Sequence, residues 1–468
     1  MRRLLALCLF CCGAAVFAAE EATDEDEIKS QWHFLLREEP GIGLKRSDSL
    51  LNPDDILGFP RLQNRVLASV DAKIPLIKGG GVNPIGELVI ADTFLYLQHE
   101  GSEPTIAKPQ IADARNFLKE LYFNVRPREF WLITLGRRNI TDGVGYSRNV
   151  VDFLANPTTL PGANFDNRYR IKNREGSILL RNEFLWKGGA ASYTYVPEIG
   201  VSSAEDAKLR TEIDRLTQFN RNAAHWLKVY QFAGGFDISL HYFYQRRHNV
   251  GLSLAKVLGE ALELHGEARL QRGSSLLDPV KLSEDTYFAG NIVAPALYSF
   301  ENRPDDTWYL RGLIGAQYTF ENKLNLSAEY YHNGEGYSPS RLNTLYNGLE
   351  LANARYASSA FVLPQGNPYR LFLLSANLNF NYLSMGQHYA FMRLADPEFF
   401  RSNKWEAAAY TSVMLSDGSG MTAGELIYKI NDRFELQMLV NGFFGSKRTE
   451  GGLFYQGMAA LLALEVQF

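Results

Sequence analysis

The side chains most able to do catalytic or metal chemistry in this chain are eight histidines and three cysteines. The histidines show no His-Glu-x-x-His motif, no paired spacing and no link to a serine motif (His33, His99, His225, His241, His248, His265, His332 and His388). Asp237 or Glu267 could complete a catalytic pair with His241 and His265. A hydrogen-bonded histidine is the simpler interpretation of both positions. We therefore predict no catalytic residues, no metal site and no cofactor.

The cysteines lie close to the start of the chain, at positions 8, 11 and 12, in an apolar stretch that follows Arg2 and Arg3. This stretch is too short to span a bilayer as a helix, and small residues follow it. The pattern predicts a secretory signal peptide over 1–19. The mature chain would then contain no cysteine, which excludes structural disulfides, thiolate metal sites and cysteine catalysis.

Composition excludes several classes of protein. The net charge is −4, which argues against a nucleic-acid partner. No apolar run beyond the signal reaches the length of a membrane-spanning helix. Aromatic residues make up 13%, which suits β-sheet and the aromatic girdles of membrane barrels.

Many segments alternate strictly between apolar and polar residues, for example 260–271, 323–332, 371–382 and 433–444. A period of two places all apolar groups on one face of a strand, whereas on a helix it would scatter them. Short turns join several segments, and long polar connections alternate with these turns (139–175, 197–222, 272–307 and 333–367). This arrangement is typical of an outer-membrane barrel, while a large soluble β-sandwich is the alternative.

The sequence thus predicts an all-β fold, a transmembrane antiparallel β-barrel with an even number of about 16–18 strands. Eighteen candidate strands can be marked, 369–382 among them, but the sides on which their turns fall conflict. We expect one misjudged strand between 386 and 430 and another near the N-terminus. The barrel would occupy 58–468, and 20–57 would be an acidic periplasmic segment.

The final residues alternate as well, and the chain ends in Phe468. Such an ending resembles the C-terminal signal by which outer-membrane barrels are recognised for insertion. We therefore expect the barrel-assembly machinery and outer-membrane lipid as partners, and the bacterial outer membrane as the location.

The polar face of the strands would line the lumen, and its charges are of both signs. The predicted lumen residues are Arg138, Arg181, Asp237, His241, Glu263, His265, Glu267, Arg269, Arg311, Glu329, Lys429 and Glu435. Apolar residues at helical spacing within 203–219 predict a short amphipathic helix in a loop. This helix would either cap the mouth or fold into the lumen.

The segment from Leu121 through Leu135-Gly136-Arg137-Arg138-Asn139 to Asp142-Gly143 resembles a motif of alginate-export-type and related porins. In that family a strand with this ending leads into a glycine-rich loop. The resemblance implies an outer-membrane channel of roughly 18 strands for a hydrophilic solute or polymer. It places Arg138 in the lumen, and Arg137, Asp142 and Gly143 at the mouth.

We expect a channel that passes a hydrophilic solute. Export of a polysaccharide such as alginate is the alternative, but a polyanion exporter should have a predominantly positive lumen. A barrel enzyme and a non-conducting structural barrel are the hypotheses of other classes.

Overall fold

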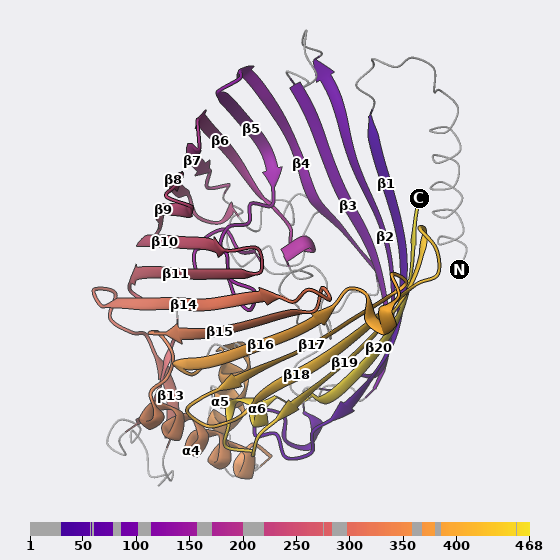
Figure 1. Cartoon of the computed structure of the whole chain (residues 1–468). Coiled ribbons are helices and arrows are strands. Elements are labelled where there is room, and N and C mark those ends of the chain that lie inside the picture. Colours follow the sequence, from indigo (N-terminus) through magenta and orange to yellow (C-terminus); the bar gives the residue numbers. More distant parts are fainter. Residues whose placement is uncertain are drawn as a thin grey trace.

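The fold comes from a computed structural model that describes residues 30–56, 58, 60–77, 86–101, 114–156, 171–199, 220–274, 276–282, 297–357, 367–379, 385–454 and 456–468. Eighteen antiparallel strands form one sheet, which closes on itself where β1 pairs with β20 (Figure 1). The predicted transmembrane antiparallel β-barrel is therefore confirmed. Within the described residues no helix is both long and apolar enough to cross a membrane.

The barrel strands follow one another around the wall in chain order. They are β1 (Gln31–Lys45), β2 (Pro60–Ile77), β3 (Gly86–Gly101), β4 (Ala114–Arg128), β5 (Trp131–Arg138), β6 (Ser177–Trp186), β7 (Gly189–Val196), β8 (Ala224–Ala233), β9 (Phe236–Gln245), β10 (Arg247–Leu258), β11 (Leu262–Arg272), β14 (Trp308–Thr319), β15 (Asn325–Asn333), β16 (His388–Asp396), β17 (Trp405–Met414), β18 (Gly420–Lys429), β19 (Phe434–Phe444) and β20 (Gln456–Gln467).

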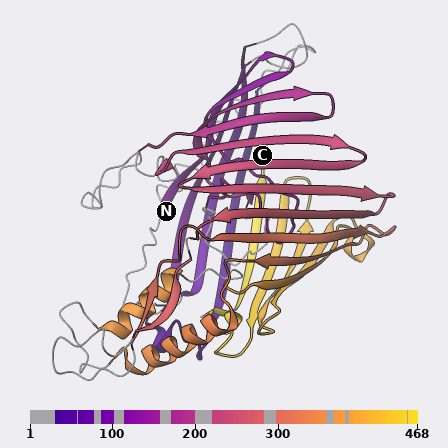
Figure 2. The same ribbon diagram turned by 90° about the vertical axis from the view of Figure 1, so that its left-hand side faces the viewer.

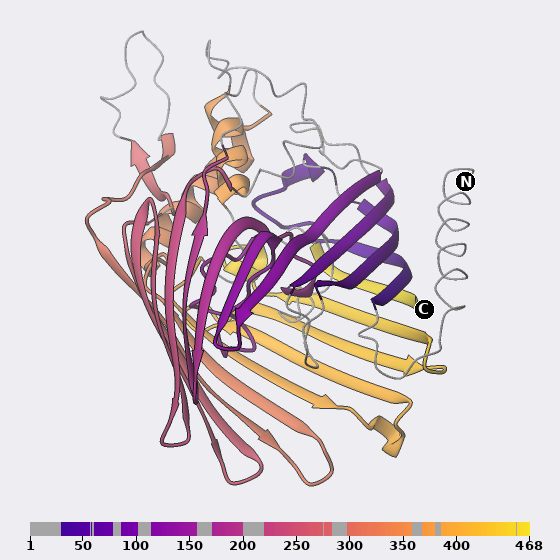
Figure 3. The same ribbon diagram turned by 90° about the horizontal axis from the view of Figure 1, so that it is seen from above.

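The smaller elements lie in the connections. They are η1 (Pro53–Asp55), the hairpin of β12 (Asp278–Leu282) and β13 (Leu297–Glu301), α4 (Pro339–Arg355), α5 (Pro368–Asn379), η6 (Phe399–Arg401) and α6 (Glu450–Leu453). Helices α4 and α5 lie at one end of the barrel, and the short strand turns lie at the other (Figures 2 and 3). We call these the loop end and the turn end.

Alternation of apolar and polar residues fixes which face of each strand points outward. On β11, Leu264 and Leu270 are exposed on the outer surface, while His265 and Glu267 are buried on the inner one. Tight turns at the turn end keep the strands adjacent. Between β8 and β9 the turn residues Gly234 and Gly235 both have positive φ, as the favoured two-residue hairpin turn requires.

The predicted strand over 369–382 is wrong, because residues Pro368–Asn379 form helix α5. Its buried residues are Tyr369, Phe372, Leu373 and Ala376, which recur at the three- and four-residue spacing of a helix. Phe372 and Ala376 fit both a period of two and a helical period, so the alternation was misleading. Residues 380–384 lie outside the described part of the chain.

The predicted N-terminal boundary of the barrel is also wrong, because the barrel begins with β1 rather than near residue 58. Three charged residues, Arg37, Glu38 and Glu39, interrupt the apolar pattern of this strand. Residues 46–56 then lie at the loop end, where Leu50, Leu51 and Ile56 pack in one hydrophobic cluster with α4 and α5. They do not form part of a free periplasmic segment.

These two errors explain why the sides on which the predicted turns fall disagreed between the middle and the end of the chain. The three strands expected between 386 and 430 are all present as β16, β17 and β18. One false strand before them and one missed strand at the N-terminus cancel in the count. The barrel has 18 strands, within the predicted range. The helix predicted in 203–219 and the signal peptide lie outside the described residues.

Candidate functional site

The loop that follows β5 folds back into the barrel and packs on its inner wall. Ile140, Val151, Phe153 and Leu154 are buried, and they form one hydrophobic cluster with wall residues of β6 to β9. The ring of Phe153 stacks on that of Phe243, with centroids 5.1 Å apart. We call residues 139–154 the inner loop. Its apolar anchors place the polar backbone of its middle part against β11 and β15.

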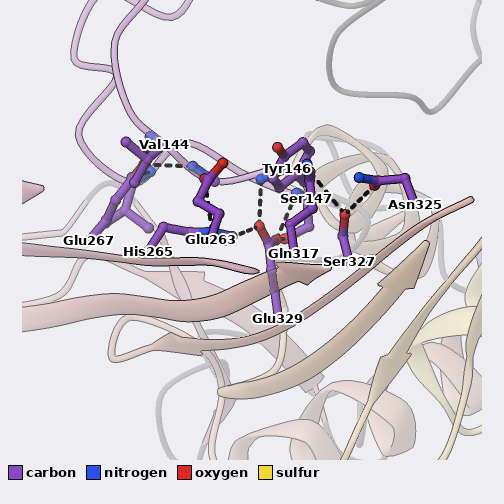
Figure 4. Close-up of polar contacts among 12 residues, drawn as sticks. Val144, Tyr146, Ser147, Glu263, His265, Glu267, Gln317, Asn325, Ser327 and Glu329 are labelled. Atoms are coloured by element: carbon purple, nitrogen blue, oxygen red, sulfur yellow. Dashed lines mark hydrogen bonds and ion pairs between the residues drawn. The ribbon is translucent and has the colours of Figure 1, made fainter. Parts of the chain in front are cut away.

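A buried carboxylate on β11 holds this middle part. Glu267 accepts hydrogen bonds from four backbone N–H groups, those of Val144, Gly145, Val150 and Val151 (Figure 4). The Gly145 and Val151 bonds measure 2.9 and 3.1 Å. Charge-assisted bonds of this kind are about twice as strong as neutral ones. The loop therefore wraps around Glu267 much as a backbone nest binds an anion.

A second carboxylate, Glu329 on β15, holds the next turn of the loop. Glu329 accepts the backbone N–H groups of Tyr146 and Ser147 at 2.5 and 2.8 Å, and also the Ser147 hydroxyl (Figure 4). The Nε2 atom of His265 lies 2.9 Å from the same carboxylate, and its Nδ1 atom lies 3.5 Å from Glu263. His265 thus links the two carboxylates Glu263 and Glu329.

Glycines make this close approach feasible. Gly143 has φ of 110°, and a Cβ atom there would lie 2.6 Å from Glu267 Oε1. A Cβ atom at Gly145 would collide with the carbonyl of Arg148. Only glycine leaves room for the backbone to reach the carboxylate. The glycine-rich character of the loop is therefore explained by its anchoring to the wall.

Ion pairs fix the two ends of the inner loop. Asp142 lies 2.5 Å from Lys228 on β8, and Asp152 pairs with Arg174. Burial raises the pKa of the Asp152 carboxyl to about 6, against the lowering effect of Arg174. The resemblance placed Asp142 and Gly143 at the mouth. The structure places them further inside, because Glu267 and Lys228 are wall residues that bind the loop along its length.

The inner loop also contacts the hydrophobic cap at the loop end. The Arg148 guanidinium lies over the rings of Tyr331 and Tyr389, 4.9 and 5.3 Å from their centroids. Both tyrosines belong to the cluster that includes α4, α5 and Leu453. The attraction between the guanidinium charge and the two ring faces holds the Arg148 side chain in place. The inner loop and the cap are therefore one packed unit.

The predicted lumen residues share the inner face through the strand register, but only some of them meet. Glu263, His265, Glu267 and Glu329 come together under the inner loop. His241 receives the indole N–H of Trp226 at 3.3 Å and packs beside Phe153, so it does not pair with His265. The suggested catalytic pair is therefore not assembled.

The remaining predicted lumen residues are distributed around the wall, and most of them have a local hydrogen-bond partner. Arg138 bonds Thr134, Arg181 bonds Glu183, Asp237 bonds Tyr230, Arg269 bonds Asn249, Arg311 bonds Glu335, Lys429 bonds Glu406, and Glu435 lies opposite Glu465 in the register. Arg137 is buried and donates to the carbonyl of Gly176 at 3.0 Å. Three of these contacts are ion pairs that compensate charge, namely Arg181–Glu183, Arg311–Glu335 and Lys429–Glu406.

The sequence did not reveal a polar network where the barrel closes. Arg37 on β1 reaches Glu465 on β20 at 2.9 Å and also bonds Gln437 on β19. It lies 2.6 Å from Glu39, which in turn pairs with Arg65 on β2 at 3.3 Å. No sequence signal could have found it, since β1 itself was placed outside the barrel.

A cavity of about 390 Å³ opens from the inner wall near the turn end, over β14 to β18. Its floor includes the small residues Ala395 and Ala408. Arg393 contributes a positive charge, while Asp396 and Glu425 contribute negative charges. The cavity therefore offers groups of both signs to a polar solute.

Comparison with known proteins gives a likeness in fold only. No family model matches the chain, and no curated protein does. Acinetobacter baumannii OccAB4 aligns over 95% of this chain and 99% of its own, at 9% identity and a TM-score of 0.50. OccAB1 of the same organism aligns over 94% and 96%, at 10% identity and a TM-score of 0.49. The outer membrane protein opdK of Pseudomonas aeruginosa aligns over 94% and 99%, at 9% identity and 0.46. The chain therefore shares its overall fold with OccAB4.

Proposed function

We propose that this chain forms a channel in the bacterial outer membrane through which a small hydrophilic solute passes. The observation that carries the proposal is the closed 18-stranded barrel, with charged and polar residues inside and apolar residues outside. Side chains can fill the interior of a barrel of about eight strands, whereas barrels of 16–18 strands enclose an aqueous channel. The inner loop, held to the wall by Glu267 and Glu329, would narrow this channel.

The outer-membrane location rests on the same features. Both ends of the described barrel lie on one side, where Phe468 and Phe34 exchange backbone hydrogen bonds of 3.0 and 3.3 Å. This side also carries the short turns, as in outer-membrane barrels whose short turns face the periplasm. Outer-membrane lipid would surround the wall, and the barrel-assembly machinery would recognise the strand that ends in Phe468.

A small solute fits the lumen better than a polyanion does. The described inner wall pairs Arg37 with Glu465, Arg181 with Glu183 and Arg311 with Glu335. These pairs leave no dominant positive field to attract a polyuronate. Although the Arg137–Arg138 motif resembles alginate-export-type porins, this charge balance favours the passage of small solutes over the export of such a polymer.

We also propose that the barrel carries out no catalysis. His265 is held between Glu263 and Glu329 under the inner loop, and His241 accepts a bond from Trp226. Both histidines are engaged in contacts that hold the inner loop and its aromatic anchors. A solute in the lumen would have no poised nucleophile to meet among these residues.

Single-channel recording of the refolded mature protein in a planar lipid bilayer tests the proposal. We expect a steady open conductance, with weak ion selectivity in the reversal potential under a salt gradient. A barrel that is folded by circular dichroism but closed to ions and to small sugars would overturn it. Strong anion selectivity would instead favour the export of a polyanion.

A further inference from the structure

Strands β15 and β16 place two histidines side by side at the loop end of the barrel. His332 is the penultimate residue of β15, His388 is the first residue of β16, and the register pairs them directly (Figure 1). The backbone N–H of Asn333 donates to the carbonyl of Gln387 at 2.7 Å, which makes that pair a hydrogen-bonded one. Pairs of two kinds alternate along an antiparallel ladder, and side chains lie closer in the non-hydrogen-bonded kind. His332 and His388 form a pair of this closer kind.

The two imidazoles face outward, at the rim of the barrel. Side chains alternate along a strand, and the neighbouring residues Tyr331 and Tyr389 are buried on the inner face. Tyr330, two residues before His332, is exposed on the outer surface. Both histidines are partly exposed. Because they lie where the two strands end, they are placed at the edge of the apolar band, within reach of water.

The separation of the two rings suits a shared metal ion. The ring centroids of His332 and His388 lie 5.0 Å apart, and the ring planes are inclined at 38°. A ring centre lies about 1.2 Å from each ring nitrogen, so two rings bound to one ion at about 2.1 Å have centres about 4.6–5.3 Å apart for bond angles of about 90–110°. The measured separation falls within this range. One ion can therefore bind to both rings without a movement of the strands.

Each of the two rings has one nitrogen engaged by the protein. The hydroxyl of Tyr330 lies 2.6 Å from Nδ1 of His388. The ring of His332 forms a hydrogen bond with the backbone of Gln387. Within the described part of the chain neither ring has a second hydrogen-bond partner, so the remaining nitrogen of each is available as a ligand. Histidines that bind metals nearly always hold their other nitrogen in such a bond, which fixes the tautomer and the ring orientation.

Two further outward histidines show what is particular to this pair. His225 on β8 and His248 on β10 also lie beside tyrosine hydroxyls, those of Tyr193 and Tyr242, at 2.8 Å each. In the register, however, both stand opposite Tyr244 of β9, one from each side. A tyrosine ring therefore separates His225 from His248. Each of them offers a single nitrogen ligand, whereas the pair on β15 and β16 offers two.

We propose that His332 and His388 bind one divalent transition-metal ion, Zn²⁺ or Cu²⁺, at the outer rim of the barrel. Neutral imidazole suits both ions, whereas Ca²⁺ and Mg²⁺ prefer oxygen ligands. In the residues that the structure describes, no group of three or more His, Cys, Asp or Glu side chains is placed to hold a metal ion, so the remaining positions are left to water. Spacing along the chain predicted no metal site, because only the strand register brings these two ligands together.

An ion at this position would tie together the base of the cap. Strand β15 leads into α4 and α5, and β16 follows them, so the chain leaves and re-enters the wall beside the two histidines. The ion would fix the strand ends next to Tyr331 and Tyr389, the two rings over which Arg148 of the inner loop lies. The site would therefore stabilise the cap and the inner loop together.

Titration of the refolded mature barrel with Cu²⁺, followed by electron paramagnetic resonance, tests the site. We expect one ion per barrel with two nitrogen ligands and a Kd of roughly 1–100 μM, because two protein ligands bind more weakly than the four of structural zinc sites. His332→Asn and His388→Asn should each weaken binding by about tenfold or more. The matched control His225→Asn/His248→Asn removes two unpaired outward histidines and should leave the Kd unchanged. Equal binding by the parent and His332→Asn, or an equal loss in the control, would overturn the proposal.

Further measurements separate a built site from accidental surface binding. Tyr330→Phe removes the bond that orients His388 and should weaken Cu²⁺ binding about tenfold, as the loss of an outer partner of a ligating histidine does. Zn²⁺ should compete with Cu²⁺, and it should raise the unfolding temperature of the parent but not that of His332→Asn. Failure of Zn²⁺ to stabilise the parent would contradict a clamp at the base of the cap. An ion held between two barrels would raise the particle mass in light scattering, and this outcome would also overturn the proposal.

Discussion

At the scale of single residues, two carboxylates decide the geometry of the lumen. Glu267 and Glu329 are buried, and each collects several N–H groups of the inner loop. Their hydrogen-bonding capacity is filled by the protein, so they do not present free charge to a solute. Residues that look like selectivity determinants in the sequence are in this structure the anchors of a loop.

Replacing Glu267 with glutamine should loosen the inner loop. The amide presents an NH₂ group to backbone N–H donors and removes the charge from several bonds. Hydrogen bonds to charged groups contribute about 1.5–3 kcal/mol each, so we expect a loss of about 3 kcal/mol for the site. Single-channel traces should then show frequent transient closures. The control Glu183→Gln, whose side chain pairs with Arg181 on the same strand, should leave the rate of closures unchanged.

Glu450, in the cap at the loop end, should make stability depend on pH. Burial raises the pKa of its carboxyl to about 7, despite the hydrogen bond from Tyr389. The folded protein thus holds this proton more tightly than the unfolded chain, whose ordinary value is 4.5. The contribution to stability is greatest below pH 4.5 and is lost as the pH rises through 7.

The unfolding temperature should therefore fall between pH 4.5 and pH 7 and level off above pH 7. Asp152, whose pKa is about 6, adds a fall of the same sign at lower pH. The variant Glu450→Gln should make the profile flatter over this interval. A wild-type profile that rises over this interval would contradict the expectation.

At the scale of elements, the closing seam between β1 and β20 depends on one arginine. Arg37 contacts residues on β19 and β20, and through Glu39 it is linked to Arg65 on β2. Strand β1 is thereby held from both neighbours by side chains as well as by its backbone ladder. A barrel that opens would open most readily at this strand if the network were removed.

Replacing Arg37 with alanine should weaken barrel closure. Removing one partner of a buried ion pair leaves the other charge uncompensated, at a cost of about 3–5 kcal/mol. We expect earlier unfolding in urea and a lower temperature for loss of the compact barrel band in gel electrophoresis. Arg181→Ala is the matched control, because the Arg181–Glu183 pair lies within one strand. Equal losses in the two variants would show that the seam has no special role.

At the scale of the whole molecule, the two chain ends meet at the turn end of the barrel. Phe468 joins β1 through backbone bonds to Phe34, while its side chain is exposed. The exposed ring contributes little packing to the folded barrel. A role in recognition during assembly is therefore separable from a role in stability.

Replacing Phe468 with serine should lower the amount of folded barrel in the outer membrane of living cells. The same variant refolded in detergent should unfold within about 1 kcal/mol of the parent, since a surface substitution seldom costs more. Comparing the yield in cells with urea unfolding of the refolded protein gives both values. A large loss of stability in detergent, with no loss of yield in cells, would contradict recognition through this residue.

The sequence by itself determined the barrel, its strand number within a narrow range, and which residues of each strand point inward in the register. Alternation is a property of neighbouring residues. It therefore shows that Leu264 and His265 point to opposite faces of the strand, even when the adjacent strands are not known. Where a segment fits both periods, only tertiary packing decides whether it is a strand or a helix. Phe372 and Ala376 fit both equally, and their burial in the hydrophobic cluster with α4 favours the helix.

The tertiary structure alone decided what the inward residues do. The inner loop lies more than a hundred residues before both Glu267 and Glu329 in the chain, and no spacing in the sequence records that they meet. The same holds for Arg37 and Glu465, which come together only when the barrel closes. Contacts between distant segments depend on the closed sheet, and for this reason the site could not be read from the sequence.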